Sequence, residues 1–302
     1  MFAHVGEPEL RYVHNGRMPE MPEVEALADY LGGRLRGRVV ARVDVAGIAA
    51  LKTYDPPPTS LGGLTISGVT RHGKFLDIDV DGLHILIHLS RAGWVRWRES
   101  LSPTPLKPGK GPIVLRVHLD DGSGLDVTEA GTKKRLAVYI VRDASEVPGV
   151  ARLGPEPLSL SRDEFDAILD AHARTQIKGL LRDQSVIAGI GNAYSDEILH
   201  VAKLSPFAMS GRLDDGARER LFAAMGTTLR DAVERSVGLP ASELKDGKRA
   251  TMRVHGRTGE ECPVCGDVVR EVSFADSSLQ YCATCQTGGK PLADRRLSRL
   301  LK

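Results

Sequence analysis

Long apolar stretches are missing from this sequence of 302 residues, although 41% of the residues are hydrophobic. No run approaches the roughly 20 apolar residues that cross a bilayer as a helix. The first segment, MFAHVGEPELRYVHNGR, also lacks the apolar core of a secretory signal peptide. We therefore expect a cytoplasmic protein with no membrane partner, long enough for two domains.

Net charge is also scarce, because the formal charge is +2 and the isoelectric point is about 8.3. This balance is compatible with an anionic partner but does not require one. The basic residues nevertheless gather in four segments: RHGK, GTKKR, DGKRATMRVHGR and DRRLSRLLK. A solvated surface would explain each segment alone, but their recurrence in different regions favours binding to a phosphate backbone.

Cysteine is confined to one short segment, in which Cys262, Cys265, Cys282 and Cys285 are the only four of the chain. They form CPVC, a spacer of sixteen residues and CATC. Disulfides are the alternative, but a reducing cytoplasm opposes them. A thioredoxin-like redox motif would use one such pair in a βαβ unit. Two close pairs of thiolates instead predict one structural Zn²⁺ in tetrahedral coordination.

The chain divides into regions of different pattern. Residues 22–36 repeat apolar side chains at the helical period, and short alternating stretches separated by turns then follow. From about Ser161 the pattern is helical, after a Gly-Pro-Glu-Pro linker at residues 154–157. Periodicity is lost after Leu239.

This order predicts an α+β protein with three folded parts. They are an N-terminal β-sandwich flanked by a helix at 18–150, a helical domain at 158–240 and a zinc ribbon at 250–287. Residues 1–17 form an upstream extension, and residues 288–302 form a basic tail. The tail is either solvated or in contact with DNA.

Two short motifs bear on function. In MPEMPEVEAL, which begins at Met18, two Pro-Glu pairs precede helix-forming residues, as suits the first turn of a helix. In SVIAGIGNAYSDEIL, residues 185–199, glycines permit a tight turn and a close approach of backbone N–H groups to a ligand. Asn192 is an N-cap by default. Alone, the first motif indicates only a helix start, and the second is a weak sign of phosphate binding.

In their order and spacing, however, the motifs indicate a family. PEMPEVE at 19–25, GIGNAYSDE at 189–197 and the CxxC-x16-CxxC ribbon together resemble the formamidopyrimidine-DNA glycosylase and endonuclease VIII family of base-excision repair enzymes. The resemblance runs from Met18 to about Gln286. It implies a helix–two-turns–helix in the helical domain, double-stranded damaged DNA as partner and one structural zinc. We further expect a monomer that associates with the nucleoid when bound to DNA.

The resemblance assigns the nucleophile to Pro19, because the family uses the secondary amine of an N-terminal proline. An α-amino group titrates near pH 8, roughly two units below lysine, so a useful fraction is unprotonated at neutral pH. A proline within a peptide bond has no such amine, so we expect the working protein to start at Met18 and to lose it. Glu20 matches the catalytic acid, which would protonate the sugar ring oxygen and shuttle the proton of Pro19.

Four further residues take their roles from the same resemblance. Lys74, in RHGKFL, corresponds to a hairpin lysine that meets phosphate and assists β-elimination. Lys178, in QIKGLL, matches a lysine that faces the lesion pocket. Asn192 and Arg257 would bind the DNA backbone.

The segments expected to fill the space of the flipped base depart from the family's pattern. HLSRAG places Arg91 where a methionine is usual, and TKKRLA at 132–137 replaces the wedge motif DPRRFG. Because base flipping costs a few kcal/mol and leaves a gap, another side chain must occupy it. Arg91, Leu136 and Arg135, the last also a predicted DNA-binding residue, are the candidates.

The zinc hairpin departs from the pattern as well. Ser277 stands five residues before the third cysteine, where the family has an arginine. This arginine is placed to assist δ-elimination, so the second elimination loses its usual cation. Arg257, Arg295 and Arg296 are the possible substitutes.

Two hypotheses from different classes follow. The first is a bifunctional glycosylase that excises oxidised bases through a Schiff base on Pro19 and nicks the strand as an abasic-site lyase. The second is a non-catalytic binder of damaged or abasic DNA. The joint presence of Pro19, Glu20 and Lys74 favours the enzyme, because a binder has no need of them.

Overall fold

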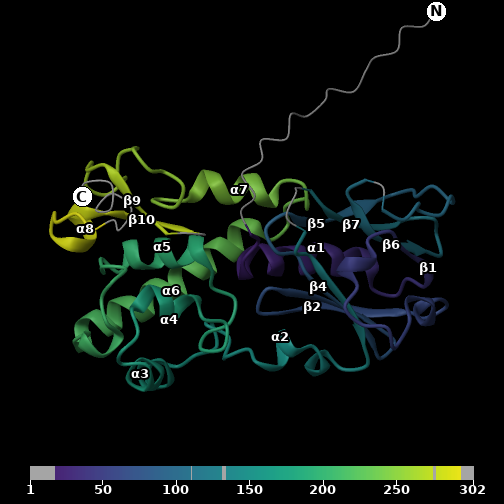
Figure 1. Ribbon diagram of the computed structural model, residues 1–302, viewed down its shortest axis with the longest axis horizontal. Helices are drawn as coiled ribbons and strands as arrows, with labels where there is room; N and C mark the ends of the chain where they lie inside the picture. The colour runs from purple at the N-terminus through teal and green to yellow at the C-terminus, as the bar shows by residue number, and fades with distance from the viewer. Residues whose placement is uncertain (1–17, 110, 131–133, 275–276, 294–302) are drawn as a thin grey trace, which may run out of the picture.

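The computed structural model describes residues 18–293, apart from residue 110 and segments 131–133 and 275–276. A lobe of strands and a lobe of helices lie at opposite ends of an elongated molecule, with helix α1 (Met21–Leu35) at their junction (Figure 1). The predictions for the upstream extension, for Thr132 and Lys133, and for the tail residues Arg295 and Arg296 lie outside the described residues.

Helix α1 differs by one residue at each end from the predicted range of 22–36. A proline stands in its first turn, and the Glu23 carboxylate caps its start by accepting the N–H of Glu20 at 2.8 Å. Leu27 is buried in the core of the strand lobe, whereas Met21 is buried in the core of the helical lobe. Helix α1 is therefore part of both cores.

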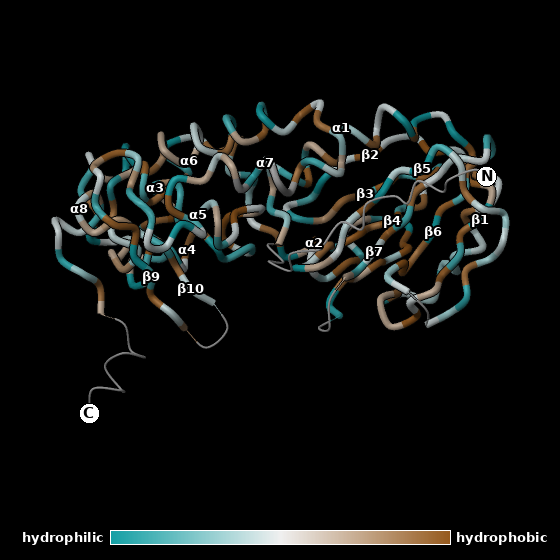
Figure 2. Tube along the Cα trace, turned by 90° about the horizontal axis from the view of Figure 1, so that it is seen from above, coloured by the Kyte–Doolittle hydropathy of each residue, from teal (hydrophilic) through white to brown (hydrophobic). Residues whose placement is uncertain are grey.

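The strand lobe, within the described residues, is a sandwich of two four-stranded antiparallel sheets, as the alternating pattern predicts. The strand orders are β1-β6-β7-β5 and β2-β3-β4-β8. Their inward apolar side chains and α1 form one core, and brown stretches follow these strands in Figure 2. The strands are Val40–Val45 (β1), Ile66–His72 (β2), Phe75–Val80 (β3), Leu83–His88 (β4), Gly93–Arg98 (β5), Ile113–Leu119 (β6), Gly124–Glu129 (β7) and Ala137–Val141 (β8).

The helical lobe follows the linker and buries the apolar faces of its helices against one another and against the first turn of α1. Tight turns join α4 to α5, as a helix–two-turns–helix requires. No helix in the described part of the chain is long and apolar enough to cross a membrane. Its helices are Arg162–Ala171 (α3), Ile177–Arg182 (α4), Asn192–Val201 (α5) and Asp215–Ser236 (α6). The short helix α2 (Pro148–Ala151) precedes the linker, and its Val150 packs on the sandwich residues Phe75 and Val141.

Helix α7 (Leu244–Thr251) follows the helical lobe, in a segment where the sequence shows no periodicity and no helix is predicted. Its sequence, LKDGKRAT, contains one large apolar residue and a glycine, and therefore lacks the apolar repeat of a helix. Leu244 is nevertheless buried in the sandwich core, and the Trp94 indole donates to the carbonyl of Ala241 at 2.8 Å. Tertiary contacts thus hold a helix that its composition does not predict.

The C-terminal ribbon completes the predicted order of sandwich, helical domain and ribbon. A two-stranded hairpin of β9 (Val269–Ser273) and β10 (Ser278–Cys282) leads into the short helix α8 (Ala283–Thr287). It lies beside α5 at the helical end of the molecule (Figure 1).

Arg71, on β2, ties the linker to the sandwich. Its guanidinium donates to the two oxygens of Glu156 at 2.9 and 2.8 Å, and to Glu25 on α1 at 2.7 Å. A further bond goes to the carbonyl of Gly73 at 2.9 Å. Burial alone would lower the pKa of Arg71, but Glu156 and Glu25 raise it above its ordinary value. One fixed guanidinium therefore connects the sheet, the linker and α1.

We expect Arg71→Ala to lower the free energy of unfolding by about 2 kcal/mol, because hydrogen bonds to charged groups are lost while two half-buried carboxylates stay in place. Urea denaturation followed by circular dichroism measures this loss. Arg142→Ala is the matched control, because Arg142 pairs with Asp55 on the open surface and should contribute little. Equal losses in the two variants would contradict the anchoring role of Arg71.

Candidate active site and metal centre

The carboxylate of Glu20 lies against the N-terminus of helix α5. Its Oε2 accepts the N–H groups of Gly191 at 2.6 Å and Tyr194 at 3.3 Å, and its Oε1 accepts that of Ala193 at 2.9 Å. The first N–H groups of a helix have no partner within the helix, and the helix dipole favours an anion there. Glu20 therefore satisfies the start of α5 from a distant part of the chain.

The charges around Glu20 keep it ionised. Burial would raise the pKa of this carboxyl, but the Lys248 and Lys74 ammoniums and the N–H of Ala193 outweigh burial and lower the pKa to about 2. Glu20 is consequently a carboxylate at neutral pH and accepts a proton before it can donate one. This order fits the shuttle that the sequence predicts, with Glu20 acting as an acid only after it has taken a proton.

Two glycines permit the close approach of Glu20. A Cβ at Gly191 would lie 2.5 Å from the Glu20 Cδ. Gly189 has a φ of +84°, a conformation that favours glycine, and its carbonyl accepts the N–H of Met21 at 3.0 Å. The N–H groups that the sequence offers to a phosphate are thus engaged by the chain's own carboxylate.

Pro19 is buried immediately before Glu20. Its nitrogen belongs to the peptide bond with Met18 in the described chain, so it is an amide without basic character. Cleavage after Met18 would convert the same nitrogen into a secondary amine next to the Glu20 carboxylate.

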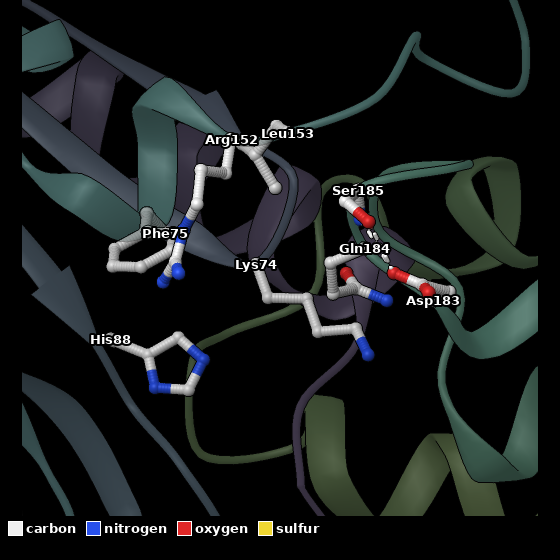
Figure 3. A pocket seen from close by; sticks show the side chains of 9 residues that line it. Lys74, Phe75, His88, Arg152, Leu153, Asp183, Gln184 and Ser185 are labelled. Carbon is white, nitrogen blue, oxygen red and sulfur yellow. Dashed lines mark hydrogen bonds between the residues drawn. The ribbon is translucent and has the colours of Figure 1, made fainter.

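Lys74 lies in the turn between β2 and β3 and lines a cavity of about 390 Å³ (Figure 3). Burial lowers the pKa of Lys74 to about 8; Glu20 opposes this shift, and Lys248 and Arg182 add to it. Lys74 is thus mainly charged at neutral pH but gives up its proton more readily than an ordinary lysine. The other residues of the cavity wall are Phe75, His88, Gly149, Arg152, Leu153, Asp183, Gln184 and Ser185.

His88 is a polar residue of this cavity that sequence analysis does not identify. Its ring packs against Phe75 with the ring centres 4.8 Å apart. Burial, and then the Lys74 charge, lower the pKa of His88 to about 4, so the ring is neutral at neutral pH. A neutral imidazole beside Lys74 can donate a hydrogen bond without adding charge.

Lys248, on α7, is a second residue that sequence analysis misses. Its ammonium lies 2.7 Å from Glu23 Oε2, 3.7 Å from Glu20 Oε1 and 4.5 Å from the centre of the Tyr194 ring. The Tyr194 hydroxyl donates to the other Glu23 oxygen at 2.5 Å. The second Pro-Glu pair of the N-terminal motif therefore belongs to the site. The motif itself was the available signal for Glu23, whereas nothing in the pattern of α7 distinguishes Lys248.

Lys178, on α4, is buried among polar partners of the helical lobe. Its ammonium donates to Asp196 Oδ1 at 2.6 Å and to Ser195 Oγ at 2.7 Å. The other Asp196 oxygen lies 2.8 Å from His255 Nδ1. Burial lowers the pKa of Lys178, while Asp196 acts in the opposite direction. The geometry joins Lys178 to α5, and its contact with a lesion stays a prediction.

The three other predicted DNA-binding residues lie on separate segments. Asn192 begins α5, and its Nδ2 donates to the carbonyl of Ser278 on β10 at 2.8 Å. Arg257 follows α7, and its Nε donates to Glu260 at 2.6 Å. Arg135 is exposed on the sandwich, shortly before β8. The contacts of these three residues with DNA stay predictions.

The candidates for the space of a flipped base differ in exposure. Leu136 is 2% exposed and belongs to the sandwich core, so its packing would have to break before it could enter DNA. Arg91 and Arg135 are exposed. Glu129 fixes the base of the loop that carries Arg135, because its Oε1 accepts the N–H groups of Arg135 at 2.6 Å and Leu136 at 2.8 Å. The two arginines remain as candidates.

The four cysteine sulfurs form one cluster, with all Sγ atoms within 4.8 Å of one another. Cys262 lies 3.9 Å from Cys285, and Cys265 lies 3.3 Å from Cys282, so neither pair is a disulfide. Zn–S bonds of about 2.3 Å in a tetrahedron place sulfurs nearly 4 Å apart, so the donor set fits a tetrahedral metal. His200, buried on α5, has its Nε2 3.3 Å from Cys262 Sγ, close enough to donate to a thiolate.

Three segments of the chain match domains of one enzyme family. Residues 18–134 match the formamidopyrimidine-DNA glycosylase N-terminal domain, residues 153–241 its H2TH domain, and residues 259–288 a zinc finger found in FPG and IleRS. An uncharacterized formamidopyrimidine-DNA glycosylase-like protein of Mycobacterium tuberculosis is 60% identical over 155 residues, 51% of this chain and 98% of that protein. A formamidopyrimidine-DNA glycosylase of Symbiobacterium thermophilum is 33% identical over 297 residues, 92% of this chain and 93% of that protein.

Solved structures have the same fold. The MutM (Fpg) protein of Thermus thermophilus covers 90% of this chain and 100% of its own, with 30% identity and a TM-score of 0.75. The Lactococcus lactis Fpg, in a complex with DNA containing an abasic site, covers 89% of this chain and 99% of its own, with 24% identity and a TM-score of 0.78. The three domain matches and the full-length relative confirm the resemblance drawn from the motifs: the chain belongs to the formamidopyrimidine-DNA glycosylase family of DNA-repair enzymes.

Proposed function

We propose that this protein is a bifunctional DNA glycosylase and abasic-site lyase whose nucleophile is the amine of Pro19. The observation that carries the proposal is the position of Glu20, an ionised and fully hydrogen-bonded carboxylate next to Pro19. A carboxylate next to the amine can take up its proton. Lys74, a buried lysine with a lowered pKa, supplies a second proton-transfer group to the same site.

The chemistry begins with the attack of the Pro19 nitrogen on C1′ of the damaged nucleotide. The new C1′–N bond replaces the glycosidic bond, the base leaves with its electron pair and takes up a proton from the solvent, and the sugar ring opens to an iminium. Glu20 accepts the proton lost by the amine and returns it to the ring oxygen. The resting carboxylate thus becomes the acid that the ring opening needs.

Strand cleavage follows from the iminium, because it makes the C2′ proton acidic. Transfer of that proton to water forms a C=C bond between C2′ and C3′ and expels the 3′ phosphate, which completes β-elimination. Lys74 is mainly an ammonium below its pKa of about 8 and can stabilise the departing phosphate. Water then releases the enzyme from the remaining sugar, and the Pro19 amine is regenerated.

Damaged double-stranded DNA is the proposed substrate. Support comes from relatives, because Lactococcus lactis Fpg is known in complexes with DNA that contains an abasic site or Fapy-dG. Exposed Arg135 and Arg91, together with Asn192 and Arg257, would bind or occupy the duplex around the flipped nucleotide. We propose that the enzyme acts as a monomer in the cytoplasm, at the nucleoid.

The four cysteine thiolates would hold one Zn²⁺ in a structural site, because four protein ligands leave no open position for water. When bound, the metal would fix the fold of the ribbon. His200 would orient Cys262, and Asn192 would join α5 to β10 through its bond to Ser278.

A non-catalytic binder of damaged DNA is the second candidate. It would apply to a chain that keeps the peptide bond between Met18 and Pro19, because such a chain has no N-terminal proline amine. Cleavage of the peptide bond between Met18 and Pro19 therefore distinguishes the enzyme from the non-catalytic binder.

We predict that protein started at Met18 and processed to Pro19 forms a covalent adduct with abasic-site DNA under borohydride, whereas a chain that keeps residues 1–17 does not. N-terminal sequencing establishes which start is present, and mass spectrometry of the trapped peptide locates the bond. A stable adduct from a chain that retains Met1 would make a lysine the nucleophile, and Lys74 would be examined first.

Metal analysis tests the ribbon. Pure, reduced protein should contain one zinc per chain, and Cys282→Ser should lose it together with much of the affinity for DNA, because the hairpin no longer has a fixed fold. Val264→Ser, at an exposed position between Cys262 and Cys265 of the other cysteine pair, is the control and should keep both the zinc and the affinity for DNA. If wild-type protein without zinc bound DNA with undiminished affinity, the structural role of the metal would be refuted.

The 3′ ends of cleaved abasic DNA report on the second elimination. We expect mainly β-product from the wild type, because Ser277 brings no cation to the remaining phosphate. Ser277→Arg should raise the share of δ-product, and Ser277→Ala should not. If wild-type protein gives rapid and complete δ-product even after truncation beyond Gln286, neither Ser277 nor the tail determines the outcome.

A further inference from the structure

Two buried carboxylates follow Pro19 closely in the chain. Glu20 and Glu23 both lie within four residues of Pro19, and both are almost fully buried. Carboxylates stabilise a neighbouring ammonium, and a protonated amine cannot attack C1′. With these two acids alone, the amine would hold its proton to higher pH than an ordinary α-amino group.

Lys248 is the group best placed to offset this charge. Its ammonium donates to Glu23 Oε2 at 2.7 Å, and the N–H of Glu20 donates to the same oxygen at 2.8 Å. The ammonium is therefore no more than two hydrogen-bond lengths from the peptide nitrogen that follows Pro19. It also lies 3.7 Å from Glu20 Oε1, so it pairs with both acids.

The surroundings hold Lys248 in this position. Its side chain is 5% exposed, and the face of the Tyr194 ring lies 4.5 Å from its nitrogen. The Tyr194 hydroxyl in turn donates to Glu23, so the aromatic ring and the carboxylate together form one binding site for the Lys248 ammonium. Lys248 is therefore held in place by two carboxylates and an aromatic face and is not a solvent-exposed side chain.

Other titratable groups face the same centre from neighbouring elements. The turn before β3, helices α4 and α5, and the segment after α7 contribute Lys74, Lys178, Tyr194, Asp196 and His255. Lys178 and His255 pair with Asp196 and not with Glu23. Arg182 acts on Lys74 and Lys178, and Arg235 acts on Tyr194, from farther away. Among these described cations, Lys248 alone is recorded in contact with both acids beside Pro19.

We propose that Lys248 is a positioning residue that neutralises Glu20 and Glu23, and thereby keeps the Pro19 amine free of its proton at neutral pH. This inference rests on the proposed function of Pro19. Helix α7, which has no counterpart among the sequence-predicted elements, would then complete the catalytic centre from outside the sandwich and the helical lobe. Lys248 itself takes no part in bond making or breaking.

The test is the pH dependence of covalent trapping on an abasic duplex, with zinc-loaded protein started at Met18 and cyanoborohydride as the reductant. The amine condenses with the abasic aldehyde, water leaves, and hydride reduces the iminium to a stable tertiary amine. We expect Lys248→Met to move the midpoint of the rate profile to higher pH by about one unit, the effect of one nearby charge. Lys248→Arg should stay near the wild type.

Lys107→Met, at an exposed site on the sandwich, is the control for loss of a lysine and should not shift the midpoint. If Lys248→Met proves unstable, Glu23→Gln/Lys248→Met removes one charge of each sign, and its midpoint should return to that of the wild type. Two results would overturn the inference, provided that the wild type is trapped. One is a midpoint in Lys248→Met equal to that of the wild type, and the other is a shifted midpoint in the double variant. If the wild type forms no adduct at any pH, the proposed function fails and the inference with it.

Discussion

The contact between the Glu20 carboxylate and the first N–H groups of α5 is the interaction on which the rest of the site depends. It satisfies N–H groups that have no partner within the helix, and it joins segments 171 positions apart in the chain. Since α1 contributes to both hydrophobic cores, the same contact also fixes the strand lobe against the helical lobe. A catalytic carboxylate and the junction between two domains are thus one structural element. Loss of Glu20 would affect architecture as well as chemistry.

Buried charge of both signs is the second constraint. Glu20, Glu23 and Asp196 are each less than 5% exposed, and Lys248 and Lys178 are paired with them. Burying an unpaired charge costs several kcal/mol, so these groups are retained only as a nearly neutral set. Such a set fixes proton positions by geometry. It explains why an acid next to the nucleophile is ionised while a nearby lysine gives up its proton readily.

The sequence predicts the fold to the extent that the fold follows from local patterns. Alternation identifies the sandwich, the helical period identifies α1 within one residue at each end, and paired cysteines predict the ribbon. It fails at α7, because that helix is polar and is held by Leu244 and Ala241 in a distant core. Lys248 and His88 are missed for the same reason: each is defined by neighbours that only the folded chain brings near. Motifs name Pro19 and Glu20, but only three-dimensional contacts give the charge state of Glu20.

Helix α5 makes a functional contact at each of its two ends. Its first N–H groups hold Glu20, and its last turn brings His200 to the sulfur of Cys262. With ten residues at 1.5 Å each, α5 separates the two contacts by about 15 Å. Inserting or deleting one residue would turn one end by about 100° relative to the other, so both contacts could not form together. Side chains along α5 can therefore be substituted, but the length of the helix cannot change. The spacing from Gly191 to His200 should be constant among relatives that keep both contacts, and it can guide the alignment of distant ones.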